Sequence, residues 1–214
     1  MTFPFPTFAP RVSQTTLSLV ASATGETNSI PIPSSVEAGD IIVIAIANSS
    51  ASQSKASDFT WVAYAGNTNG IYNDGGGGIA FKSADGTEGG TTSTGWTGYS
   101  PRYALAVFRP NTAAASVTLG NGTGSAAYWD IGPHTETPTA SDKTTLTLGW
   151  SNRNLDTFSG GGNNPVTGSG VITNPTYGDD LYYVTQLPST AVDVTVDTND
   201  DGINVLISGY LEVS

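Results

Sequence analysis

The chain has 214 residues, 18 acidic against 7 basic side chains, a net charge of −11 and no cysteine. Binding to phosphates depends on clustered Lys and Arg, so this charge argues against nucleic acid and against an anionic membrane surface as partners. A thiolate zinc site and a cysteine nucleophile are excluded. The hydrophobic share of 37% with 12% charged residues is that of a folded chain, because disorder needs low hydrophobicity and high charge.

The first residues predict an extended arm. Residues 1–10 read MTFPFPTFAP, in which prolines separate Phe3, Phe5 and Phe8. Proline fixes φ and removes a hydrogen-bond donor, so residues 1–15 are expected to be neither helical nor a central strand. The arm either folds back on its own domain or docks on a neighbouring subunit, and we favour docking. This segment lacks the basic and apolar regions of a signal peptide, and no apolar run approaches a membrane span.

Residues 16–214 predict one all-β domain. Residues 16–23 alternate, which places Leu17, Leu19 and Ala21 on one face, and residues 41–47 are apolar on both faces, as in the middle of a sandwich. Trp61 and Trp150 are expected in the core. The remaining expected strands are residues 61–64, 79–81, 103–108, 116–119, 144–150, 181–184, 192–196 and 203–213. Repeated short strands without a helical period are typical of a β-sandwich.

Glycine-rich segments are interpreted as connections between these strands. Residues 48–58 and 152–170 predict long loops, residues 75–78 a hairpin tip, and residues 120–124 a turn. Residues 79–108 and 181–209 follow the same order of apolar strand, polar turn and alternating strand. This similarity fits a sandwich built from two related sets of strands, and it also fits coincidence.

Several of these segments together resemble a known module. They are the turn Ala38-Gly39-Asp40 before a buried strand, the Trp strand of residues 59–62, FKSADGTEGG at residues 81–90 and YALAVFRP at residues 103–110. Residues 17–110 thereby resemble a jelly-roll-like module of tailed-bacteriophage virion proteins, and the rest of the chain does so only loosely. The resemblance implies a jelly-roll-like sandwich and a structural role in a virion.

One acidic segment allows a metal site. Asp197, Asn199 and Asp201, followed by Gly202, match the first half of a calcium-binding loop. The position of the bidentate glutamate is Ser208. Asp-Gly is also a strong hairpin signal, so residues 197–202 are interpreted first as a hairpin turn and second as a Ca²⁺ site, which Asp179 and Asp180 could join.

The sequence predicts no catalytic site. The single histidine, His134, follows a proline and is expected to be a solvated loop residue. A Ser-His-Asp triad would have to use it, and no G-x-S-x-G segment is present. Glu88 or Glu136 could form a carboxylate pair with an aspartate, but nothing in the sequence marks such a pair.

The expected function is therefore that of a non-catalytic structural protein on the outside of a phage particle. Head decoration or a head fibre is the first expectation and a tail position the second, with copies of the chain and capsid or tail proteins as partners. The protein would be made in the host cytoplasm. The alternative is a carbohydrate-binding module, at a tail tip or free of any particle. It would contact a host-surface glycan through Trp96, Tyr99 and Trp129, since aromatic rings serve as sugar platforms.

Overall fold

The chain is described here from a computed structural model. The structure describes residues 14–48, 55–66, 75–88, 92–93, 101–112, 115–127, 131, 133–138, 142–151, 157–160, 166–175, 179–187, 194–197 and 204–214. Within these ranges all regular elements are β-strands. This confirms the all-β class.

The first half of the chain forms strands β1 (Leu17–Gly25), β2 (Ile30–Pro31), β3 (Ile41–Asn48), β4 (Thr60–Gly66), β5 (Gly76–Ser83), β6 (Thr92–Ser93) and β7 (Arg102–Pro110). The second half forms β8 (Val117–Ala127), β9 (His134–Glu136), β10 (Thr144–Ser151), β11 (Thr157–Gly160), β12 (Val166–Asn174), β13 (Asp179–Gln186), β14 (Val194–Asp197) and β15 (Asn204–Val213).

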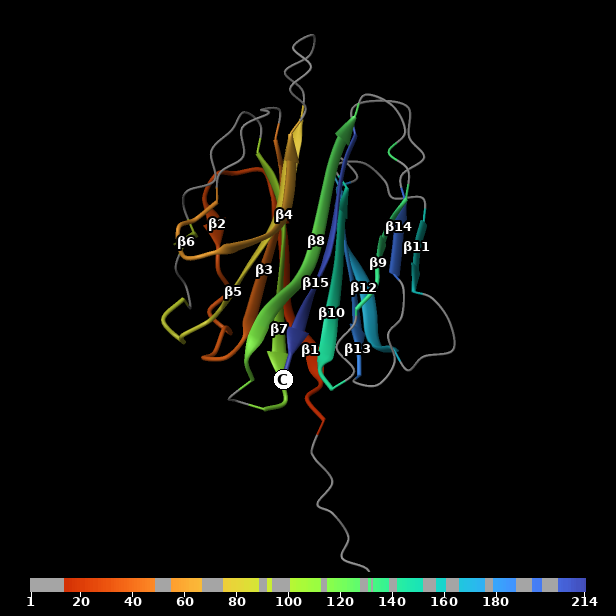
Figure 1. The fold of residues 1–214 in the computed structure, drawn as a ribbon. Coiled ribbons are helices and arrows are strands. Elements are labelled where there is room, and N and C mark those ends of the chain that lie inside the picture. Colours follow the sequence, from red (N-terminus) through yellow and green to blue (C-terminus); the bar gives the residue numbers. More distant parts are fainter. Residues whose placement is uncertain are drawn as a thin grey trace, which may run out of the picture.

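Two five-stranded antiparallel sheets pack face to face (Figure 1). Sheet 1 has the order β1-β7-β3-β5-β4, and sheet 2 has the order β12-β13-β10-β15-β8. The short pair β2–β6 lies outside sheet 1, and the three-stranded covering sheet β11-β14-β9 lies outside sheet 2. The structure therefore confirms a β-sandwich, in which each half of the chain forms one sheet.

The two halves share one topology. When the strands of each sheet are numbered in chain order, sheet 1 counted from β1 and sheet 2 counted from β8 both have the order first, fifth, second, fourth, third. The outer pairs also correspond, because β2 pairs with β6 and β9 pairs with β14 at matching places along the chain. The similarity between residues 79–108 and 181–209 thus reflects equivalent parts of the two sheets, and residues 17–110 are the whole of sheet 1.

A β-bulge falls at the same place in both halves. The first strand of each sheet pairs with the fifth, and the pairing skips its fourth residue, Val20 in β1 and Gly120 in β8. A bulge changes the face on which later side chains lie. Leu17 therefore packs between the sheets while Ala21 packs on the outer face of sheet 1, so the prediction that they share a face is wrong.

The main core lies between the sheets. Leu146, Leu148 and Trp150 alternate along β10 and are fully buried in it, as their spacing predicts. β3 is buried on both faces because sheet 1 is covered on both sides. Its outward side chains belong to a second apolar cluster, which contains Ile30, Ile32, Val36, Ile42, Ile44, Ile46, Phe59, Leu105 and Val107. Trp61, predicted in the core, is only partly buried and packs against this second cluster.

Two glycine-rich segments predicted as a hairpin tip and a turn are strands instead. Gly76, Gly77 and Gly78 open β5, and residues 120–124 lie inside β8. Glycine is needed here for close approach rather than for a turn. A Cβ on Gly78 would lie 2.5 Å from the Trp61 ring, and one on Gly122 would lie 2.1 Å from the carbonyl oxygen of Val62.

We expect Gly122→Ala to lower the free energy of unfolding by about 1–3 kcal/mol, because overpacking forces strands apart. The obstacle is a backbone oxygen of β4, which cannot rotate away. Urea unfolding measures the change. Thr123→Ala, at the exposed next position of β8, is the matched control. Equal stability of the two variants would contradict this account of the contact between β4 and β8.

The pairing of strands corrects two further predictions. β14 and β15 flank residues 197–202 but belong to different sheets, so the predicted hairpin between them does not exist. The chain passes there from the covering sheet to sheet 2. Residues 152–170, predicted as one loop, contain β11 and the start of β12.

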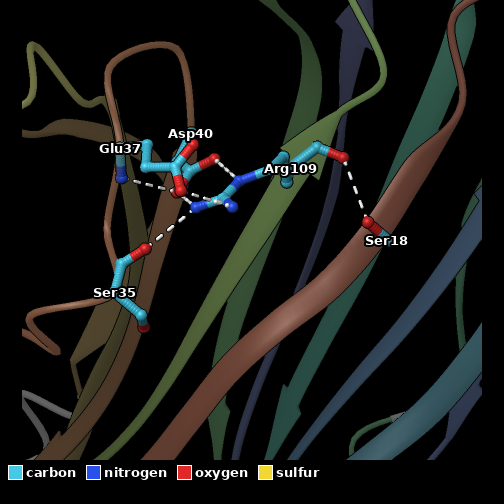
Figure 2. A network of polar contacts seen from close by, with 5 residues as sticks. All are labelled: Ser18, Ser35, Glu37, Asp40 and Arg109. Carbon is cyan, nitrogen blue, oxygen red and sulfur yellow. Dashed lines mark hydrogen bonds and ion pairs between the residues drawn. The ribbon is translucent and has the colours of Figure 1, made fainter.

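A charged network holds the turn before β3 against the end of β7 (Figure 2). Arg109 Nε lies 2.8 Å from Asp40 Oδ1, and Nη2 lies 2.8 Å from Asp40 Oδ2, which is a bidentate pair. The guanidinium also donates to Glu37 Oε1 and to the carbonyl oxygen of Ser35, each at 2.9 Å. Burial would raise the pKa of Asp40, but the hydrogen bonds from Arg109 and from the Glu37 N–H hold it below its usual value.

The second half has a matching pair with the signs exchanged. Glu212 occupies in β15 the place of Arg109 in β7, and Lys143 directly precedes β10, two residues before Thr145, which is the equivalent of Asp40. Lys143 Nζ and Glu212 Oε2 lie 2.8 Å apart. Both halves therefore tie the start of the second strand to the end of the fifth by an ion pair.

Candidate functional sites

The structure leaves most of the residues predicted for a site undescribed. Phe3, Phe5 and Phe8 of the arm, Trp96, Tyr99 and Trp129 of the glycan alternative, and Asn199 and Asp201 of the Ca²⁺ alternative all lie outside the described residues. Asp197 is the last residue of β14. Among the described residues no group of three or more His, Asp or Glu is placed to hold a metal ion.

The first candidate site is the set of sheet edges. β1 and β4 are the edges of sheet 1, and β12 and β8 are the edges of sheet 2. All large apolar side chains that are exposed in the described part of the chain lie on these four strands. They are Leu19, Val20, Tyr64, Leu119 and Val171, each at least 37% exposed.

These edges form two similar sides of the sandwich. β1 lies next to β12, and β4 lies next to β8, so each side combines one edge of each sheet. Leu19 and Leu119 are equivalent, since each is the third residue of its strand and directly precedes the bulge. The two sides therefore present related apolar surfaces in opposite directions.

The second candidate site is a buried polar cluster between sheet 2 and β9. His134 Nε2 lies 2.9 Å from Ser125 Oγ of β8, and His134 Nδ1 lies 3.3 Å from Ser208 Oγ of β15. Ser208 donates to Glu136 Oε1 at 2.6 Å, and Asn121 Nδ2 donates to Glu136 Oε2 at 3.2 Å. The expectation that His134 is a solvated loop residue is wrong, because it is only 9% exposed.

The electrostatics of the cluster favour a neutral imidazole. Burial lowers the pKa of His134 below its usual 6.5, and the nearby carboxylate of Glu136 opposes this only in part. His134 is therefore uncharged at neutral pH. Glu136 is 1% exposed and Ser208 is fully buried, whereas Ser125 is half-buried.

Sequence reasoning missed this cluster, although part of its signal is visible. His134 and Glu136 are two residues apart, the spacing that puts both on one face of a strand. The strand itself has three residues and was not predicted. Ser125 lies nine residues before His134 and Ser208 lies 74 residues after it, and the fold brings all four side chains together.

A buried ion pair crosses the core at one end of the sandwich. Asp179 of β13 is fully buried, and Arg102 Nε of β7 lies 3.4 Å from its Oδ2. Neither carboxylate oxygen has a hydrogen-bond partner among the described residues. Burial raises the pKa of Asp179 to about 7; Arg102 opposes this, and Asp180 and Glu26 add to it.

Comparison of the chain with protein-family models, with curated proteins and with solved structures finds no match. Among the described residues there is no helix of the length and apolar character needed to cross a membrane.

Proposed function

We propose that this protein is a structural subunit on the exterior of a bacteriophage particle and that assembly is its main task. A head-decoration or head-fibre subunit is the first candidate, and a tail-associated subunit is the second. The resemblance of residues 17–110 to virion modules supports both. The proposed partners are copies of the same chain together with a capsid or tail protein.

The observation that carries this proposal is the position of the exposed apolar side chains. An edge strand offers unpaired N–H and C=O groups to another chain, and apolar side chains on it strengthen such contacts. Here Leu19 and Leu119 occupy equivalent edges on opposite sides of the sandwich. Two related surfaces that point away from each other allow one subunit to contact two neighbours.

The arm belongs to the same surface in this proposal. Residues 1–15 lead directly into β1, the edge strand that carries Leu19 and Val20. An arm with Phe3, Phe5 and Phe8 that starts at an edge is well placed to reach a neighbouring subunit. It would add apolar area to a contact that begins at the strand.

We expect the double variant Leu19→Arg with Leu119→Arg to weaken self-association at least about tenfold, because charges at the contact are desolvated without partners. Light scattering coupled to size-exclusion chromatography measures the association. The control is Ser18→Arg with Thr118→Arg, at the exposed neighbouring positions of the same two strands. Equal self-association of the two double variants would contradict the proposal that the edge strands β1 and β8 form the contacts between subunits.

Deletion of residues 1–10 should leave a folded domain that no longer enters particles. Circular dichroism checks the fold, and immunogold labelling of intact particles locates the protein. Label on heads supports decoration, and label on tails supports an adsorption role with a host-surface glycan as partner. Absence of label from all particles would overturn the virion proposal.

A further inference from the structure

The polar cluster is not a requirement of the fold, because the first half of the chain shows the same place filled with apolar side chains. Strand pairing makes Leu105 of β7 equivalent to Ser208 of β15, and Ile44 of β3 equivalent to Gly149 of β10. Both apolar residues are fully buried and belong to the second apolar cluster, which also contains Ile30 of β2. The fold therefore accepts apolar side chains at this place, and the second half instead holds polar groups that bond to one another.

The hydrogen-bond directions in the cluster follow from its donors. Ser208 has one hydroxyl hydrogen and donates it to Glu136, so its oxygen can only accept from His134 Nδ1. The hydrogen of the neutral imidazole is then on Nδ1, and Nε2 carries a free lone pair. Ser125 must therefore donate its hydroxyl hydrogen to Nε2.

The contacts run from Ser125 to His134 to Ser208, which is the order of nucleophile, base and orienting group. A hydroxyl within 2.9 Å of an imidazole nitrogen, whose other nitrogen is held by a further group, is the arrangement that activates a serine. In a Ser-His-Asp triad a carboxylate holds the second nitrogen directly. Here the hydroxyl of Ser208 stands between His134 and the carboxylate of Glu136.

The position of Ser125 fits this role. It is half-buried on the edge strand β8, whereas His134, Glu136 and Ser208 are buried. Ser125 is thus the residue of the cluster's Ser-His pair that is more open to a reagent from solvent.

From these contacts we propose that Ser125 is an activated nucleophile that accepts acyl groups from carboxylic esters, with His134 as its general base. This site lies beyond the proposed assembly role, and it replaces the expectation that the chain has no catalytic site. Ser208 and Glu136 are positioning residues, since neither touches Ser125.

The proposed step balances within the site and its substrate. Ser125 Oγ bonds to the acyl carbon of the ester, and its proton moves to His134 Nε2. The bond between the acyl carbon and the alkoxy oxygen breaks, and the leaving alcohol takes the proton from Nε2. A water oxygen then bonds to the acyl carbon and gives its proton to the same nitrogen. The bond between the acyl carbon and Ser125 Oγ breaks, Oγ takes that proton back, and the carboxylic acid leaves.

The first test is acylation of the full chain by p-nitrophenyl acetate, followed by peptide mass spectrometry. We expect an acetyl adduct on Ser125 and none on the exposed Ser18. The acylation rate should rise with pH as His134 loses its proton, with a midpoint below 6.5 because burial lowers the pKa of His134. His134→Gln should slow acylation by about 100-fold, within the range for a general base. Absence of the adduct on Ser125, or an unchanged rate in His134→Gln, would overturn the proposal.

A second test does not depend on the stability of these variants. The chain has no cysteine, so Ser125→Cys and the matched control Thr123→Cys, two positions earlier on β8, each carry a single thiol. We expect iodoacetamide to alkylate Ser125→Cys at pH 6 at least about tenfold faster than Thr123→Cys, because an imidazole favours the thiolate. Equal rates for the two folded variants would show that His134 does not activate this position.

Discussion

Replacement of Arg109 by alanine is expected to lower the melting temperature and the urea midpoint clearly, because the nearly fully buried Asp40 carboxylate would lose its bidentate partner. Asp40 is 1% exposed, and each of its two carboxylate oxygens accepts a hydrogen bond from the Arg109 guanidinium. Without the guanidinium, its charge stays buried and loses two donors. Thermal and urea unfolding at pH 7 measure the loss.

The loss should depend on pH in a defined direction. The pKa of Asp40 is lowered in the folded protein, so its ionisation stabilises the fold above pH 4 and ceases to do so as the pH falls through the folded pKa. The difference between wild type and Arg109→Ala should therefore be largest at neutral pH and shrink in acid. A difference that stays constant down to pH 2 would contradict the role of the ion pair.

The pair in the second half provides the control. Lys143 and Glu212 tie the corresponding strands, but the Glu212 side chain is 15% exposed and that of Lys143 is 30% exposed. Arg109 is just as exposed, at 32%, so the difference lies in the carboxylates. Glu212 is partly solvated and Asp40 is not, so Lys143→Ala is expected to lower stability much less than Arg109→Ala. A loss that is equal in the two variants would contradict this account, since burial of the carboxylate is the difference between the two pairs.

The sequence predicted the sheets better than their connections. Runs such as residues 41–47 and 144–150 were identified because alternation or a continuous apolar run is a local signal. The sequence predicts a strand only over residues 116–119, because the glycines that follow are typical of a turn. In the structure the strand continues, and the missing side chain of Gly122 leaves room for the backbone of Val62. That requirement comes from another strand and leaves no trace in the local sequence.

The candidate sites were less accessible to sequence reasoning for the same reason. Leu19 and Leu119 look like ordinary strand residues until the order of strands places both on edges. His134 resembles a loop residue because β9 is too short to show a period. The internal similarity of the halves was visible in the sequence, and only the strand order shows that equivalent positions are apolar in one half and polar in the other.

Asp179→Asn is expected to stabilise the protein above pH 7 by about 4 kcal/mol, since one pKa unit corresponds to about 1.4 kcal/mol and the pKa rises from 3.8 to about 7 on folding. Between these values the folded state binds a proton that the unfolded state has lost. Wild-type stability therefore falls as the pH rises from 4 to 7. Asparagine has the same shape and carries no charge, so the stability of Asp179→Asn should not decrease in this way between pH 4 and pH 7.

At pH 4 the two proteins should unfold at nearly the same temperature, and at pH 8 the variant should melt about 10 °C higher. Arg102→Gln gives the opposite control, because Arg102 is the cation that opposes the raised pKa. Its loss should cost more stability at pH 8 than at pH 4. Equal melting temperatures of wild type and Asp179→Asn across this range would mean that the carboxylate between the sheets is already charged and compensated at pH 4.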